Sequence, residues 1–315
     1  MCAEYIGGLH EIAPSTYAYL QPNGSWGWSN AGLIRDGEEA LLVDTLFTVE
    51  LTRRMLATIE RALPALDIRL VVNTHGDGDH WWGNQLVSGS TIIASAAAVR
   101  EMRHAGPAGF TSALEAGKAD PRFAELAKLF ADFDFRDIAP TYPAIAFAGE
   151  LEVSVGARTV RLIEVGPAHT EGDVLVHVPD QRVLFTGDIL FIGGHPVVHS
   201  GPVDRWIEAC DLILDLDVKT IVPGHGPVVG KAEVAHFRDY LTRVRDHAVA
   251  AHGRGSTVIE ATREFDLDGF ADLDDNGRLL LNIGAVYREL NGDGTPDERE
   301  LMPIMHELTR HYETR

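Results

Sequence analysis

The sequence contains few cysteines, and the two that it has, Cys2 and Cys210, lie far apart. Two distant thiols cannot form the disulfide framework of a small secreted protein, so we expect a reducing compartment, namely the cytoplasm. The first ten residues, MCAEYIGGLH, have neither the basic start nor the apolar stretch of a secretory signal peptide, and they support the same expectation.

Basic residues are also scarce, since 27 lysines and arginines face 47 acidic residues and leave a net charge of −20. Such a surface repels phosphate backbones, so we expect no nucleic-acid partner. The sequence has no run of roughly 18 or more apolar residues, and we therefore expect no membrane-spanning segment. What is present is a chain of 315 residues with 45% hydrophobic residues, which predicts a globular protein.

Strand and helix patterns alternate along the chain in the way that layered α/β or α+β domains require. Strand patterns fill residues 15–45, and residues 48–62 have the apolar spacing of an amphipathic helix. Residues 96–135 are rich in Ala, Glu, Lys and Phe, and we interpret them as a helical insert. We expect residues 1–230 to form a catalytic domain and residues 231–315 to form a helical extension that packs on it. The insert and the extension are expected either to shape a pocket or to form a homodimer surface.

Histidines and aspartates follow four separate predicted strands, each just past the carboxyl end of its strand. Strand ends at one edge of a sheet lie close in space, so we expect these side chains to meet in one pocket. Imidazole and carboxylate groups suit Zn²⁺, Mn²⁺ or Fe²⁺, and seven of them fit two ions better than one. The seven candidate ligands are His75, Asp77, Asp79, His80, His169, Asp188 and His225.

The order and spacing of these residues resemble those of the metallo-β-lactamase superfamily. NTHGDGDH resembles the His-x-His-x-Asp-His signature of the family, GPAHTEGD its third-histidine loop, FTGD its bridging aspartate and VPGHG its final histidine. The likeness extends over residues 15–230. It implies a four-layer αββα sandwich, with the metal ions at one edge of the two sheets.

The resemblance also implies a role for each candidate ligand. It assigns His75, Asp77 and His169 to a first ion, Asp79, His80 and His225 to a second ion, and Asp188 to both. Asp44 matches an acidic position that in the family supports the metal-binding loop without binding an ion.

The chain departs from the family signature at Asp77, where the family has a histidine. Three carboxylates and a bridging hydroxide would neutralise two divalent ions, whereas a histidine at position 77 would leave one positive charge. A less positive centre polarises its water less, so we expect the pKa of that water to rise. We expect two divalent ions, with zinc as the first choice and manganese or iron favoured at the first position by the harder carboxylate.

The function that the resemblance implies is a hydrolase of a small-molecule substrate, in which a metal-bridging hydroxide attacks the carbonyl of an ester, thioester, lactone or lactam. Asp79 would orient the hydroxide. His195, in GGHPVVHSG, is a candidate for binding substrate or protonating the leaving group, with a purely structural role as the alternative; the same alternatives hold for His199. A di-iron redox enzyme on the same fold and a phosphodiesterase are further alternatives, and the charge of −20 disfavours the phosphodiesterase.

Two further stretches stand out. DLDDNG, residues 272–277, has the spacing of the start of a calcium loop, but its twelfth position is Ile283, where such loops need a bidentate glutamate. We therefore interpret it as a solvated turn. Trp26 and Trp28 lie in a hairpin-like stretch, and they are expected either to line the pocket or to pack in the core.

Overall fold

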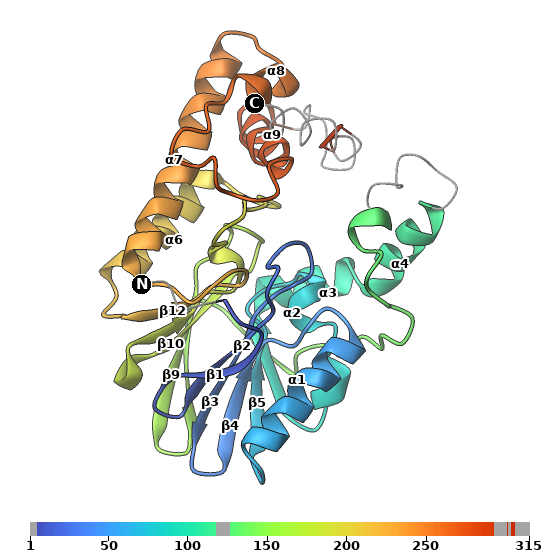
Figure 1. Cartoon of the computed structure of the whole chain (residues 1–315), viewed down its shortest axis with the longest axis vertical. Coiled ribbons are helices and arrows are strands. Elements are labelled where there is room, and N and C mark those ends of the chain that lie inside the picture. Colours follow the sequence, from blue (N-terminus) through green and yellow to red (C-terminus); the bar gives the residue numbers. More distant parts are fainter. Residues whose placement is uncertain (1–4, 118–126, 293–300, 302–303, 306–315) are drawn as a thin grey trace.

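The computed structural model describes residues 5–117, 127–292, 301 and 304–305, and all structural statements below concern these residues. Two β-sheets lie at the centre, and helices cover their outer faces (Figure 1). The predicted helix over residues 48–62 illustrates why the helices pack there, because its apolar side chains recur on one face and are buried against the sheet. It is observed as α1 (Val49–Ala62), and the hydroxyl of Thr48 caps it by accepting a hydrogen bond from the Leu51 amide.

The first sheet contains seven strands in chain order. Strands β1 to β4 pair antiparallel through short turns, and β4 to β7 pair parallel. Its strands are β1 (Gly8–Ala13), β2 (Thr16–Leu20), β3 (Ala31–Asp36), β4 (Glu39–Val43), β5 (Asp67–Val72), β6 (Thr91–Ser95) and β7 (Ile145–Phe147).

The second sheet has the order β12-β11-β10-β9-β8. All its neighbours pair antiparallel except β11 and β12, which are parallel. Its strands are β8 (Glu150–Val155), β9 (Arg158–Glu164), β10 (Val174–Val178), β11 (Val183–Phe185) and β12 (Thr220–Val222). Because β11 and β12 are parallel, their carboxyl ends lie at the same edge of the second sheet. The loop that follows β5 leaves the carboxyl end of the first sheet's parallel strands and can meet the loops that follow β11 and β12.

Three hydrophobic clusters define the layers. Between the sheets, side chains such as Leu41 and Phe185 pack against one another. On the outer face of the first sheet, Met55 of α1 packs with the side chains of β3 to β5. On the outer face of the second sheet, Trp206 of α6 (Val203–Asp215) packs over β10 to β12. Burial of both sheet faces and of one face of each helix gives the predicted αββα sandwich, which is confirmed.

The predicted insert over residues 96–135 contains α3 (Ala96–His104) and α4 (Pro107–Ala116), whereas its last described residues, 130–135, form turns and loop. Residues 118–126 lie outside the described residues. Phenylalanines of the insert pack against the sandwich in an aromatic cluster. At its centre the ring of Phe47 stacks on Trp82, with centroids 5.1 Å apart. The remaining members of this aromatic cluster are Phe110, Phe130, Phe133 and Phe135.

The C-terminal region is helical as predicted, with α7 (Lys231–Gly253), α8 (Val258–Glu264) and α9 (Arg278–Asn291). These helices stack beside α6 (Figure 1) and share its hydrophobic core. The division of the chain at residue 230 therefore stays a prediction. Most of the predicted extension beyond residue 292, namely residues 293–300, 302–303 and 306–315, lies outside the described residues. Within the described parts of the chain, no helix combines the length and apolarity that crossing a bilayer would need.

Candidate metal centre

The stretch NTHGDGDHWWGN leaves the carboxyl end of β5 and forms a one-turn helix, α2 (Gly78–Trp81). Asp77 occupies the N-cap position of this helix, so its backbone is extended while the following residues turn. Gly78 is required by close packing, because an added Cβ would lie 2.4 Å from the ring of Trp82. The tight turn aims the ligand candidates that precede it and follow it toward the same side.

The first group of predicted ligands comes together from β5 and the loop after β9. Asp77 Oδ2 lies 3.0 Å from His169 Nε2 and 3.8 Å from His75 Nε2. One ligand atom from each of the three residues lies within 4.8 Å of the other two. The three ligand atoms therefore surround a common point, at which one cation could contact all of them.

The second group joins α2 to the loop after β12. Asp79 Oδ2 lies 3.3 Å from His225 Nε2 and 3.8 Å from His80 Nε2. Their ligand atoms also lie within 4.8 Å of one another. The structure thus brings these three residues together as the resemblance implies.

Asp188 lies between the two groups, in the short 3-10 helix η3 (Gly187–Ile189) that follows β11. Its Oδ2 lies 3.5 Å from His169 Nε2 and 3.3 Å from His225 Nε2. Its Oδ1 lies 3.0 Å from His80 Nε2. One carboxylate therefore reaches histidines of both groups, as a bridging ligand must.

Each of the four histidines uses Nδ1 for an outer partner and turns Nε2 toward the centre. Metal-binding histidines characteristically use their second ring nitrogen in this way, because the outer hydrogen bond fixes the ring. The outer partners are Thr74 Oγ1 for His75 (3.0 Å), Asp44 Oδ2 for His80 (2.8 Å), Val197 O for His169 (2.6 Å) and Gly24 O for His225 (3.0 Å).

Asp44 has the supporting position that the resemblance implies. It is buried, and it accepts hydrogen bonds from the Thr74 amide (2.7 Å) and the Thr74 hydroxyl (2.8 Å) besides contacting His80. Its backbone has a φ of 63°, in the left-handed region that aspartate and asparagine tolerate better than most residues. Asp44, which directly follows β4, therefore links the start of the metal-binding loop at Thr74 to the ligand candidate His80 at the end of that loop.

The electrostatics of the two groups differ. Burial lowers the pKa of His75 to about 3, so its imidazole is neutral. Burial also opposes the charge of His225, but the carboxylates of Asp188 and Asp79 outweigh it and raise the pKa of His225 to about 9. The pKa of His80 is raised by Asp188, Asp79 and Asp44, again against the effect of burial. Burial raises the pKa of Asp79 and Asp188, but the neighbouring histidines outweigh it and lower both values, so these two carboxylates are ionised at neutral pH, whereas burial dominates at Asp44 and raises its pKa.

Three buried polar atoms at the centre lack a hydrogen-bond partner within the described residues: His75 Nε2, His80 Nε2 and Asp188 Oδ1. His80 Nε2 and Asp188 Oδ1 are close, but their geometry is not that of a hydrogen bond. Buried polar groups are nearly always satisfied, so atoms of this kind indicate a missing partner. Nitrogen and carboxylate donors are the set that borderline divalent cations take. The residues present therefore fit two such ions.

The two histidines of GGHPVVHSG, His195 and His199, have different surroundings in the structure. His195 is fully buried, and its ring nitrogens lie 2.7 Å from the Tyr240 hydroxyl and 3.1 Å from Asn276 Oδ1. With both nitrogens occupied, His195 has a structural position, and its predicted catalytic role is not carried further. His199 is the histidine that reaches the centre, since its Nε2 lies 3.4 Å from Asp77 Oδ2. Spacing in the sequence gave no signal to distinguish the two.

The loop between β2 and β3, residues 21–30, supports the centre in a way that the sequence did not reveal. The Ser29 hydroxyl donates to the Asp79 carbonyl at 2.6 Å. The Asn30 side chain donates to the carbonyl oxygens of Pro223 (3.0 Å) and Gly226 (2.8 Å), on either side of His225. This β2–β3 loop also carries Trp26 and Trp28, which are half-buried and contact the aromatic cluster of the insert.

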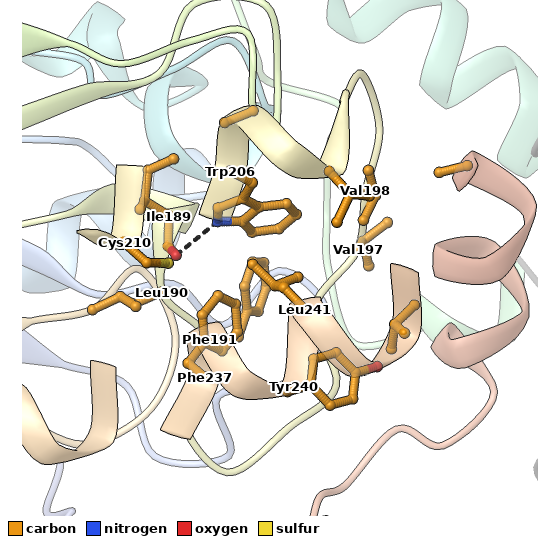
Figure 2. Close-up of a cluster of buried hydrophobic side chains, with 14 of the residues drawn as sticks. Ile189, Leu190, Phe191, Val197, Val198, Trp206, Cys210, Phe237, Tyr240 and Leu241 are labelled. Atoms are coloured by element: carbon orange, nitrogen blue, oxygen red, sulfur yellow. Dashed lines mark hydrogen bonds between the residues drawn. The ribbon is translucent and has the colours of Figure 1, made fainter. Parts of the chain in front are cut away.

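Helix α6 supports the centre through the side chain of Trp206. The indole of Trp206 donates a hydrogen bond to the carbonyl of Ile189 at 2.9 Å, as Figure 2 shows, and so fixes the segment that carries Asp188. The same indole lies 5.5 Å from the ring of His169, centroid to centroid. Cys210 and Leu241 close the apolar layer around it (Figure 2).

Comparisons with known proteins agree with this geometry. The model of the Metallo-beta-lactamase superfamily matches residues 24–225. The chain is 34% identical over 80 residues to Beta-lactamase-like protein 2 homolog of Caenorhabditis elegans, covering 25% of this chain and 26% of that protein. It is 22% identical over an alignment of 343 residues to alkyl/aryl-sulfatase BDS1 of Saccharomyces cerevisiae, covering 95% of this chain and 51% of that protein.

Among solved structures, the stereoselective inverting sec-alkylsulfatase Pisa1 from Pseudomonas sp. has the same fold. It superposes with a TM-score of 0.72 at 18% identity, over 91% of this chain and 51% of that one. The chain thus spans about a quarter to a half of the length of these relatives. The family match includes more than half of the chain and every predicted ligand. The chain belongs to the metallo-β-lactamase superfamily.

Proposed function

We propose that this protein is a hydrolase that binds two divalent metal ions and cleaves a carboxylic ester, thioester, lactone or lactam. The observation that carries the proposal is the convergence of seven ligand-type side chains with their histidine Nε2 atoms turned inward. The outer nitrogens of these histidines are already engaged, and two of the inner ones are buried without a hydrogen-bond partner within the described residues. Bound cations would give these buried nitrogen atoms the partners that they otherwise lack.

Two bound divalent ions would supply a water molecule of lowered pKa and polarise the substrate carbonyl. The first group, His75, Asp77 and His169, and the second group, Asp79, His80 and His225, would hold one ion each, with Asp188 shared. Asp79 is the most suitable residue to orient the attacking water, because its side chain keeps some exposure (13%) while the histidines beside it are buried.

The identity of the ions is part of the proposal. Zinc suits the second group, which has two imidazoles and one terminal carboxylate. Asp77 adds a hard, anionic ligand to the first group, and its side chain is 35% exposed. A hard ligand at an open position favours manganese or iron there, or weaker binding of zinc.

Sulfate esters are a second candidate substrate class. The alignments with the yeast alkyl/aryl-sulfatase and with Pisa1 include nearly the whole chain, and so extend past residue 225 into the C-terminal helices. The family match ends at that residue. A shared C-terminal region is the specific observation that favours this candidate, since such regions shape the pocket around a common metal centre.

The test combines metal analysis with a substrate panel. Purified protein is stripped with a chelator, reloaded with Zn²⁺ or Mn²⁺, and offered p-nitrophenyl esters, a thioester, a lactone, a chromogenic cephalosporin, p-nitrophenyl sulfate and bis-p-nitrophenyl phosphate. We expect about two ions per chain and metal-dependent turnover of a carbonyl substrate. Turnover of the sulfate alone would favour the second candidate. Two bound ions with turnover of nothing on the panel would contradict the hydrolase, and iron with a visible absorption band would point to redox chemistry.

A further inference from the structure

The DLDDNG stretch, residues 272–277, is exposed at Asp272 and Asp274, as a solvated turn would be, but its second half is packed against the rest of the chain. We call residues 274–278 the C-terminal turn. Arg278 is 2% exposed and Asp275 is also partly buried, with a φ of 61°. The Arg278 guanidinium lies 3.2 Å from the Asp275 carboxylate. The C-terminal turn therefore holds an ion pair in the interior, which needs a reason because burying charge is costly.

One side of the C-terminal turn is attached to the β2–β3 loop, some 250 residues away in sequence. The Ser25 hydroxyl lies 2.9 Å from both carboxylate oxygens of Asp275 and donates to this carboxylate. The Arg278 guanidinium lies 4.3 Å from the ring centroid of Trp26, the distance of a cation–π contact. Ser25 and Trp26 directly follow Gly24, whose carbonyl accepts the hydrogen bond from His225 Nδ1.

The other side of the C-terminal turn is attached to the segment after η3. Arg278 Nη1 donates to the carbonyl of His195 at 2.9 Å, and the His195 amide donates to the carbonyl of Asp274 at 2.9 Å. The His195 ring also contacts Asn276. This explains the position of His195, which joins the C-terminal turn to residues 191–195.

Both attached segments contact His225. Besides the hydrogen bond to Gly24, the imidazole stacks on the ring of Phe191, with centroids 5.0 Å apart and planes within 1° of parallel. The Ile192 amide donates to the carbonyl of His225 at 3.0 Å. The ring of His225 is therefore clamped between two segments, and the C-terminal turn is the element that connects both of them.

We propose that the C-terminal turn is a positioning element for the second metal-binding group, acting on His225 through Gly24 on one side and Phe191 on the other. The proposal rests on the proposed dinuclear centre, and it gives the C-terminal helices a role that the family match does not include. The first group has outer partners of its own, Thr74 for His75 and Val197 for His169, and it meets the clamping segments at an edge contact, the rings of His169 and Phe191 lying 5.5 Å apart, centroid to centroid. Because His225 has both the hydrogen bond to Gly24 and the stacked Phe191 ring, loosening the C-terminal turn should weaken the second metal site much more than the first.

The experiment is a zinc titration of the full chain against a chromophoric chelator, which yields two stepwise constants. The test variants are Ser25→Ala, which removes the donor to Asp275, and Asp275→Asn, which removes the charge while asparagine still tolerates the left-handed backbone. The matched controls are Ser25→Thr, which keeps the hydroxyl, and Asp274→Asn, which changes an exposed neighbour.

We expect one constant to weaken by about tenfold in the test variants, in the range known for outer partners of metal ligands, while the other stays within about twofold. The loss should persist in the His169→Ala background, where only the second group is complete, and both controls should bind like the parent chain. Unchanged constants would overturn the proposal. So would a parallel fall of both constants that tracks the melting temperature of the metal-free protein, because that is general destabilisation.

These outcomes are separate from those of the hydrolase proposal. A chain that binds two zinc ions, shows the selective loss and turns over no substrate would retain the positioning role and lose the hydrolase. A parent chain that binds no zinc would overturn both.

Discussion

The two proposed metal-binding groups are built from the same kinds of side chain but are supported differently. The first group includes Asp77, which is 35% exposed, replaces the family histidine and has His199 as a further neighbour. The second group is more deeply enclosed, with His80 held by Asp44 and His225 held by the β2–β3 loop. The comparison teaches that the departure from the family signature at Asp77 lies where the proposed site is open, while the enclosed group has the family residues and contacts both segments that the C-terminal turn connects.

Asp188 tests what the two groups share, and it should give the largest effect. In Asp188→Asn the shared ligand loses its charge while its shape is kept. Because Asp188 lies within 3.0–3.9 Å of all four histidines, both metal constants should weaken by more than the roughly tenfold to hundredfold seen for outer partners. Zinc titration and kcat/KM on the best substrate measure this, and the loss of only one ion would contradict the shared position.

Asp44 tests the support of the second group alone. In Asp44→Asn the backbone at φ 63° is still tolerated, but the charge that fixes His80 is lost. We expect a loss of roughly tenfold to hundredfold in one metal constant, with the other nearly unchanged. Equal losses in both constants would show that Asp44 supports the whole metal loop.

The pH dependence of binding should distinguish the groups. In the metal-free protein His225 has a pKa raised to about 9 and that of His80 is also raised, so both hold protons near neutral pH that a cation must displace. In the first group His75 is already neutral, with a pKa of about 3, and only His169 is raised.

Between about pH 6.5 and 9 the second constant should therefore strengthen as pH rises, by up to about a hundredfold per pH unit for two protons. The first constant should strengthen by at most about tenfold per pH unit. Zinc titrations at three pH values, with the released protons counted in weak buffer, measure both slopes. A steeper slope for the first group would contradict the assignment of the pKa shifts.

Asp77→His restores the family residue and should have the smallest effect, confined to the first group. We expect zinc to bind there several-fold more tightly relative to manganese, because imidazole is the softer ligand. The pH at which turnover is half-maximal should fall, because the centre gains one positive charge. Identical metal preference and pH profile in both proteins would show that residue 77 does not contact an ion.

The sequence predicted the fold and the convergence of the candidate ligands, because both follow from local patterns. A buried strand ending in histidine or aspartate is visible in the chain itself, and strands of one sheet bring such ends together, as His75 and His225 show. The contact between Ser25 and Asp275 has no such signal, since it depends on how a loop and a distant helix pack. For the same reason the sequence could not tell that His199 reaches Asp77 while His195 is enclosed by Tyr240 and Asn276.

The most direct test of the account is a crystal structure of the zinc-loaded protein with anomalous diffraction recorded at the zinc edge. The account predicts two peaks about 3.5–4 Å apart, one beside His75, Asp77 and His169 and the other beside Asp79, His80 and His225, with Asp188 between them. A single peak, or peaks away from these side chains, would contradict it.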